Sequence, residues 1–209
     1  MADEILVYIS AAADLQPERE ILGRAVTEVP VTLGWRVVQS PPGDEPADLD
    51  AAADADVHIL LLGSDIRAPI GREWVAARRA GRQPLPFLKQ GVLQTPAAQS
   101  FQRFIEEQVA WRPFRGASEL RRQVLKLLAD HILIRAHYYA LSPPELTGLQ
   151  AWRSEIERPG HSVDEATQGG AATSGVVLSP QRYVPSEGVL VQPAAEKSRN
   201  NMEEKPSDR

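Results

Sequence analysis

The chain has 209 residues, of which 43% are hydrophobic and 24% charged, and it carries a net charge of −5 and no cysteine. This composition fits one globular domain with extra segments, and it excludes disulfides, thiolate metal sites and a cysteine nucleophile. The acidic balance argues against nucleic acid as the main partner. Because no apolar run approaches the roughly 18 residues of a membrane span and the N-terminus is acidic, we expect a cytoplasmic protein without a membrane partner.

Short apolar runs alternate with amphipathic segments along the first 141 residues. Strands are predicted at 5–9, 35–39, 57–62 and 85–89, with a fifth, edge strand at 111–114 because Pro113 cannot donate to a central ladder. Helices are predicted at 15–28, 47–55, 100–109 and 118–141, and Asp14 is placed to cap the first of them. A further helix begins near Ile70 or Gly71 and stops at Gly81.

This alternation predicts an α/β fold with a parallel five-stranded sheet in the flavodoxin-like order 2-1-3-4-5. We expect it to occupy residues 1–141, followed by a helical extension at 142–159 that Ser142 and Glu145 open as a capping box. Residues 160–209 are expected to form a linker and a mostly disordered, flexible tail. Its two apolar triplets, 176–178 and 189–191, leave three possibilities open: a hairpin, docking on a partner, or mobility.

The candidate site follows from this fold, since doubly wound sheets bind ligands at the carboxyl ends of their strands. Glu73 is expected in the first turn of the helix after the third strand, where the helix dipole favours a carboxylate. Ser10 follows the first strand and Asp65 ends the third. Arg67 and Arg72 are expected to flank the same carboxyl end of the sheet. Each of these residues also has a purely structural interpretation: Glu73 as a dipole stabiliser, Asp65 as a turn residue, Ser10 as a loop hydroxyl and the arginines as part of a solvated helix face. The histidines show no ligand spacing, so no metal site is expected.

Three stretches together resemble a bacterial family of unknown function that is grouped with TIR-like domains and nucleoside 2-deoxyribosyltransferases. The stretch 8–19 is similar to the family's Phe-Ile-Ser-Ser-Thr, Asp-Leu and Glu-Arg opening, although Ala11 and Ala12 replace two hydroxyl residues. Glu73-Trp74 followed by Ala77 is similar to its Glu-aromatic pair and alanine. The stretch 81–84 is similar to its Gly-Lys-Pro turn, with one residue inserted.

The resemblance implies that Glu73 works at an N-glycosidic bond of NAD or a nucleoside. Glu73 would stabilise or trap the oxocarbenium-like sugar, while Ser10, Asp65, Arg67 and Arg72 would bind ribose and phosphate. NAD would then be a substrate, and no cofactor is expected. The alternative is a non-catalytic TIR-like module in a signalling or defence complex, which self-associates or binds a protein partner.

Overall fold

The computed structural model describes residues 4–41, 45–158 and 176–178. Its sheet has the strand order β5-β4-β3-β1-β2-β6, and the first five strands are parallel, which confirms the predicted order 2-1-3-4-5. The parallel strands are β1 (Glu4–Ala11), β2 (Gly34–Gln39), β3 (Val57–Leu62), β4 (Leu85–Lys89) and β5 (Arg112–Phe114). As predicted, the strand that contains Pro113 lies at the edge.

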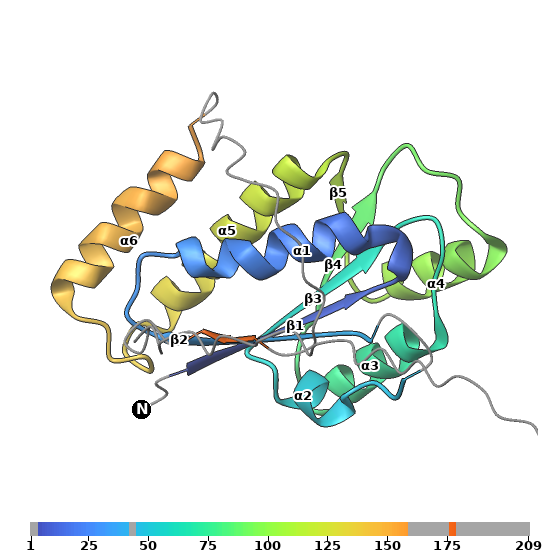
Figure 1. Cartoon of the computed structure of the whole chain (residues 1–209), viewed down its shortest axis with the longest axis horizontal. Coiled ribbons are helices and arrows are strands. Elements are labelled where there is room, and N and C mark those ends of the chain that lie inside the picture. Colours follow the sequence, from blue (N-terminus) through green and yellow to red (C-terminus); the bar gives the residue numbers. More distant parts are fainter. Residues whose placement is uncertain (1–3, 42–44, 159–175, 179–209) are drawn as a thin grey trace, which may run out of the picture.

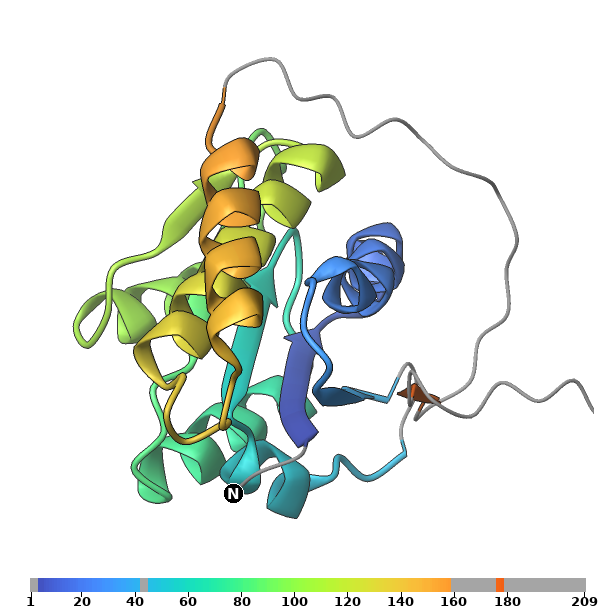
Figure 2. The same cartoon turned by 90° about the vertical axis from the view of Figure 1, so that its left-hand side faces the viewer.

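Helices cover both faces of this sheet. One face carries α1 (Gln16–Ala25), α5 (Ala117–Ile134) and α6 (Pro143–Ile156), and the other carries α2 (Leu49–Asp54), α3 (Ala68–Arg79) and α4 (Pro96–Glu106) (Figure 1 and Figure 2). Two short 3₁₀ turns, Ala13–Leu15 and Val26–Glu28, flank α1. Every side chain of β3 is buried, as expected for a central strand covered on both faces.

The alternation of side chains along the strands separates an apolar face from a mixed one. Ile5, Val7 and Ile9 of β1 point into the large core beneath α1 and α5. The intervening residues of β1 point toward α2 and α3, where Leu60, Ile70 and Trp74 form a smaller core. Polar side chains are buried on this second face, and they form the candidate site.

Three helices differ at their boundaries from the sequence expectation, and one of them is α4, which spans Pro96–Glu106 rather than residues 100–109. Helix α5 ends at Ile134 rather than near residue 141, and turns that include Ala140 at φ 50 follow it. The side chain of Ile134 is 77% exposed, so it does not continue the buried stripe. Helix α3 begins at Ala68, because Pro69 is accepted in its first turn. Glu73 therefore lies in the second turn, and the first-turn dipole argument was wrong.

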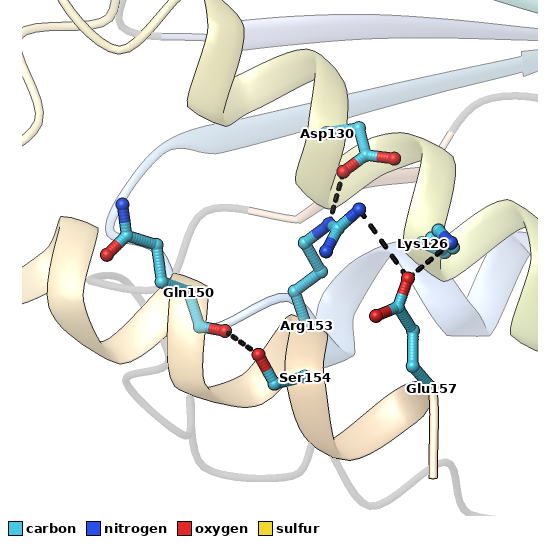
Figure 3. A network of polar contacts seen from close by, with 6 residues as sticks. All are labelled: Lys126, Asp130, Gln150, Arg153, Ser154 and Glu157. Atoms are coloured by element: carbon cyan, nitrogen blue, oxygen red, sulfur yellow. Dashed lines mark hydrogen bonds and ion pairs between the residues drawn. The ribbon is translucent and has the colours of Figure 1, made fainter. Parts of the chain in front are cut away.

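Helix α6 is tied to the body of the domain at both ends. Ser142 and Glu145 form the predicted capping box, and Glu145 Oε1 also accepts from Thr32 Oγ1 at 2.6 Å, which joins α6 to the loop before β2. Farther along, Arg153 pairs with Asp130 of α5 and lies 3.5 Å from Glu157, which in turn pairs with Lys126 (Figure 3). These contacts hold α6 along α5.

A sixth strand, β6 (Val176–Leu178), pairs antiparallel with β2 at the sheet edge, with Arg36 opposite Val177. The structure thus pairs the first apolar triplet with β2 of its own chain, an arrangement that was not among the three possibilities left open by the sequence. The second triplet, 189–191, and the expected linker and tail at 160–175 and 179–209 lie outside the described residues. Among the helices that are described, none is long and apolar enough to cross a bilayer.

Candidate functional site

Five polar side chains from four elements meet beneath α3, and we call them the Glu73 cluster: Tyr8, Ser10, Ser40, His58 and Glu73. Tyr8 and Ser10 alternate on the mixed face of β1, and the β1–β3 register places His58 directly opposite Tyr8. Ser40 follows β2, and its backbone N–H extends the ladder to Ile9. Glu73 reaches down from α3 onto this group. Ser10 is thus a strand residue rather than the loop residue expected from the sequence.

Glu73 accepts two short hydrogen bonds at one carboxylate oxygen. Ser10 Oγ donates to Glu73 Oε2 at 2.5 Å, and Ser40 Oγ donates to the same oxygen at 2.7 Å. His58 Nε2 lies 2.7 Å from Ser10 Oγ. The chain of contacts from histidine through serine to carboxylate joins β3, β1 and α3, while Ser40 adds β2.

The protonation pattern of His58 follows from these contacts. Burial lowers the pKa of His58 to about 3, so the ring is neutral at physiological pH. Ser10 already donates its only hydroxyl proton to Glu73, so His58 must donate from Nε2–H to Ser10 Oγ. His58 Nδ1 therefore carries a lone pair, and it has no hydrogen-bond partner.

Tyr8 completes the cluster on the side of α2. Burial, the negative charge of Glu73 and a contact with its carboxylate raise the pKa of Tyr8 well above its usual value, so the phenol keeps its proton. The Tyr8 hydroxyl lies near the Glu73 carboxylate but outside hydrogen-bond geometry, so it has no hydrogen-bond partner. The Tyr8 and His58 rings meet edge to face, with centroids 5.1 Å apart.

A second pair of buried charges lies at the start of α1. Arg19 donates through Nη2 to Ser40 O and through Nε to Gln39 Oε1 at 3.3 Å, so it holds the end of β2 that also contacts Glu73. Burial lowers the pKa of Arg19, while the charge of Glu73 opposes this effect. Glu18, its neighbour, pairs with Lys89 at the end of β4 at 2.7 Å.

Three of the buried side-chain polar atoms that lack a partner in the described ranges belong to the Glu73 cluster, and the other two belong to Glu18 and Arg19 of α1. They are Tyr8 Oη, Glu18 Oε2, Arg19 Nη1, His58 Nδ1 and Glu73 Oε1. Native proteins leave few such atoms, and each costs about 1–3 kcal/mol or more, so their concentration at one place is unusual. Unpartnered polar atoms that gather in this way are typical of sites that do more than stabilise the fold.

The loops at the carboxyl ends of β1 and β3 are joined just beyond the cluster. Asp14 Oδ2 accepts from the backbone N–H of Ser64 at 2.8 Å and from its hydroxyl at 2.7 Å. A Cβ at Gly63 would lie 2.5 Å from the same oxygen, so only glycine permits this approach. The prediction that Asp14 caps the first helix was wrong, because its carboxylate is used in this contact between loops.

The structure brings only two of the five predicted site residues together, Ser10 and Glu73. Asp65 is exposed in the β3–α3 loop and accepts from Thr95 Oγ1 at 2.8 Å, a bond that, together with a backbone N–H, lowers its pKa. Arg67 precedes α3, and its charge acts on Asp65. Arg72 is exposed on the outer face of α3, in a groove beside α2.

Sequence reasoning missed Ser40, Tyr8 and His58 as partners of Glu73. His58 did carry a signal, since a titratable residue inside the otherwise apolar run 57–62 has to be buried. Ser40 had only its position after a strand, and the bonding of both serines to one carboxylate oxygen depends on strand register. Neither the role of Ser40 nor the shared carboxylate oxygen could be derived without knowing the register of the sheet.

The arrangement offers hydrogen-bonding groups for an organic ligand. Within the described ranges, no three histidine or acidic side chains converge as metal ligands. Comparisons with protein families, with curated proteins and with solved structures found no match to this chain. The fold and the site together define the class as a flavodoxin-like α/β domain with a buried carboxylate cluster between its central strands and α3.

Proposed function

We propose that this chain is a TIR-like, nucleotide-recognising domain in which Glu73 acts at the N-glycosidic bond of NAD or a nucleoside. The observation that carries the proposal is the concentration of unpartnered buried polar atoms around Glu73, beneath the helix that follows the third strand. Open α/β sheets bind ligands near the carboxyl ends of their strands, which favours a ligand site in this region.

The unpartnered atoms have the donor and acceptor character that would suit the hydroxyl groups of a ribose. Glu73 Oε1 and His58 Nδ1 are both acceptors, and the Tyr8 hydroxyl between β1 and α3 can donate or accept. Two neighbouring sugar hydroxyls would supply donors to the two acceptors. Arg19 Nη1, on the far side of Ser40, is a donor suited to a phosphate oxygen.

The chemistry assigned to Glu73 is stabilisation of positive charge on the sugar. As the bond between C1′ and the base breaks, its electron pair leaves with the base and the sugar becomes oxocarbenium-like. The Glu73 carboxylate, held by Ser10 and Ser40, stabilises this cation. Water then adds to C1′ and releases a proton, or a second base adds in a transfer reaction.

Access to Glu73 is the main requirement of this proposal. The Glu73 side chain is fully buried, with 0% of its surface exposed, so the side chains that cover it have to move before a ligand reaches it. Enzymes commonly open and close such sites, and the closed form excludes water from the reacting sugar.

A chromatographic assay tests the proposal. Purified wild-type protein and the variant Glu73→Gln are incubated with NAD and with a panel of nucleosides and deoxynucleosides, at low and high protein concentration. We expect nicotinamide or free base to appear with the wild type only. The proposal fails if the folded Glu73→Gln protein is as active as the wild type, or if the wild type neither turns over nor binds any of these compounds.

The complete burial of Glu73 favours a second candidate function, a non-catalytic interaction module. In that case the Glu73 cluster only holds α3 on the sheet, and the protein works through its surface as part of a signalling or defence complex. An assay that is silent for both proteins, combined with specific self-association or partner binding, would support this candidate.

A further inference from the structure

The order of contacts around Ser10 is the reverse of that in a catalytic serine triad. In such a triad the carboxylate binds the histidine, and the histidine takes the proton of the serine. Here the carboxylate of Glu73 binds Ser10 directly at 2.5 Å, and His58 reaches Ser10 from the other side at 2.7 Å. The Ser10 hydroxyl therefore gives its proton to Glu73 and serves His58 as an acceptor, so it is not an activated nucleophile.

This chain of contacts has two possible proton arrangements. Ser10 lies between two buried partners, and its hydroxyl has one proton for both. In the first arrangement Ser10 donates to an ionised Glu73, and His58 donates to Ser10 through Nε2–H. In the second, a protonated Glu73 donates to Ser10, and Ser10 donates to His58 Nε2, so that the ring carries its proton on Nδ1.

The second arrangement holds one more proton than the first. To convert one into the other, a proton binds to His58 Nδ1, the Nε2 proton passes to Ser10 Oγ, and the Ser10 proton passes to Glu73 Oε2. The ring is neutral before and after, which suits a site where burial lowers the pKa of His58 to about 3. The 2.5 Å bond between Ser10 and Glu73 is at the short end for a hydroxyl and a carboxylate, so this proton has only a short way to move.

The histidine end of this chain of contacts is open. His58 Nδ1 is buried and accepts no hydrogen bond from any residue that the structure describes, so it is the atom at which a proton can enter. The other ionisable groups around Glu73 are Tyr8 of β1, whose phenol keeps its proton, and Arg19 of α1, whose positive charge favours an ionised Glu73. Asp48, the N-cap of α2, adds a negative charge that acts on Tyr8.

We propose that His58 and Ser10 form a two-state proton relay to Glu73, in which the tautomer of His58 follows the protonation of Glu73. One proton taken up at His58 Nδ1 delivers one proton to Glu73 Oε2, and the reverse movement removes it. His58 is thus a positioning residue that acts on Glu73 through Ser10. In the proposed reaction, the water that adds to C1′ releases one proton, and the relay gives that proton a path to Glu73; this use alone rests on the proposed function.

The variant Glu73→Gln should place the relay in its second arrangement at neutral pH. A glutamine side chain has an NH₂ group with two protons and a carbonyl oxygen with none. In the position of Oε1, which has no partner, the NH₂ group would leave two buried donors unsatisfied, whereas in the position of Oε2 it donates to both Ser10 and Ser40. Ser10 then has to donate to His58 Nε2, and His58 has to carry its proton on Nδ1.

Nitrogen-15 NMR of the imidazole ring distinguishes the two tautomers, and His58 is assigned through its edge contact with the Tyr8 ring. We expect Nε2–H in the wild type and Nδ1–H in Glu73→Gln, so the two nitrogen signals exchange their chemical-shift ranges. The matched control Glu18→Gln changes another buried carboxylate, one that pairs with Lys89, and should keep the wild-type tautomer. Circular dichroism melting confirms that the variants are folded. If Glu73→Gln does not fold, the same exchange is measured in the wild type as acid protonates Glu73, which its carboxyl carbon-13 signal reports.

Three results would overturn the relay. The first is a wild-type His58 ring that carries a proton on Nδ1 or on both nitrogens at neutral pH. The second is a ring that keeps Nε2–H when Glu73 is replaced or protonated, and the third is a change of tautomer in Glu18→Gln. Because no ligand takes part in this measurement, failure of the relay is distinguished from failure of the proposed N-glycosidic chemistry.

Discussion

Replacing Ser10 by alanine should destabilise the protein more than any other single hydroxyl deletion at the Glu73 cluster. The Ser10 hydroxyl is bonded at once to Glu73 and to His58, and all three side chains are buried. The substitution Ser10→Ala removes a donor from the carboxylate and leaves the Nε2–H of His58 without an acceptor. Two buried groups lose a partner through one substitution.

The expected cost follows from these two losses. A hydrogen bond to a charged group contributes about 1.5–3 kcal/mol, and a buried donor left unsatisfied costs about 1–3 kcal/mol. We therefore expect Ser10→Ala to lower the free energy of unfolding by about 3–5 kcal/mol. Ser40→Ala removes only one bond to Glu73 and should cost about 1.5–3 kcal/mol.

Equilibrium unfolding in urea, followed by tryptophan fluorescence and by circular dichroism, measures these differences. Trp74 is buried next to Glu73 and reports on the packing of α3. Ser100→Ala serves as the matched control, because that hydroxyl bonds only to Pro96 O on the exposed face of α4. A loss for Ser10→Ala that is no larger than that for Ser40→Ala would refute the bonding pattern assigned to His58.

Three further changes test other parts of the structure. Gly63→Ala places a Cβ 2.5 Å from Asp14 Oδ2 and should lower the free energy of unfolding in urea by about 1–3 kcal/mol. The control Gly148→Ala adds a Cβ that meets nothing within 4 Å inside α6 and should raise the free energy of unfolding by about 0.5–1 kcal/mol. Equal effects of the two substitutions would contradict this reasoning. Hydrogen bonds lower the pKa of Glu145 to about 2 from its usual 4.5, so its stabilisation is complete above pH 4.5 and is lost as the pH falls toward 2. Glu145→Gln should accordingly lose less stability than the wild type on acidification over that range. Urea unfolding of both proteins at pH 5 and pH 3 measures this loss, and an equal loss in the two proteins would disprove the assigned role. Arg153→Gln should lower the denaturation midpoint only slightly, and a difference from wild type that survives about 1 M salt would show that the pairs in Figure 3 are not ordinary surface ion pairs.

The strands and their order could be predicted from the sequence because the apolar runs are short and strongly patterned. The run 57–62 is apolar at five of six positions, which is typical of a central strand buried on both faces. Pro113 marked the edge strand, and Ser142 with Glu145 marked the start of α6. Each of these signals is local: the run 57–62 acts through burial of apolar side chains, Pro113 through a missing backbone donor, and Ser142 with Glu145 through a capping contact.

One error came from a local signal that was misread, and the others arose where a partner lies far away in the sequence. Helix α3 starts earlier than expected because a proline that resembles a loop residue is tolerated in a first turn. Asp14 is of a residue type that often caps helices, but in the fold its carboxylate accepts a hydrogen bond from Ser64 instead. Asp65, Arg67 and Arg72 were grouped with Glu73 by proximity in sequence, whereas the actual neighbours of Glu73 come from other strands.

Binding of ADP-ribose, measured by isothermal titration calorimetry, tests the central claim most directly, because this molecule presents ribose hydroxyls and phosphates but no nicotinamide that could be released. The wild type should bind it, Glu73→Gln should bind at least about 10-fold more weakly, and the control Glu20→Gln, which changes an exposed side chain of α1, should match the wild type. Absence of binding to the wild type, or equal binding to all three folded proteins, would contradict the assignment of Glu73 to a nucleotide site.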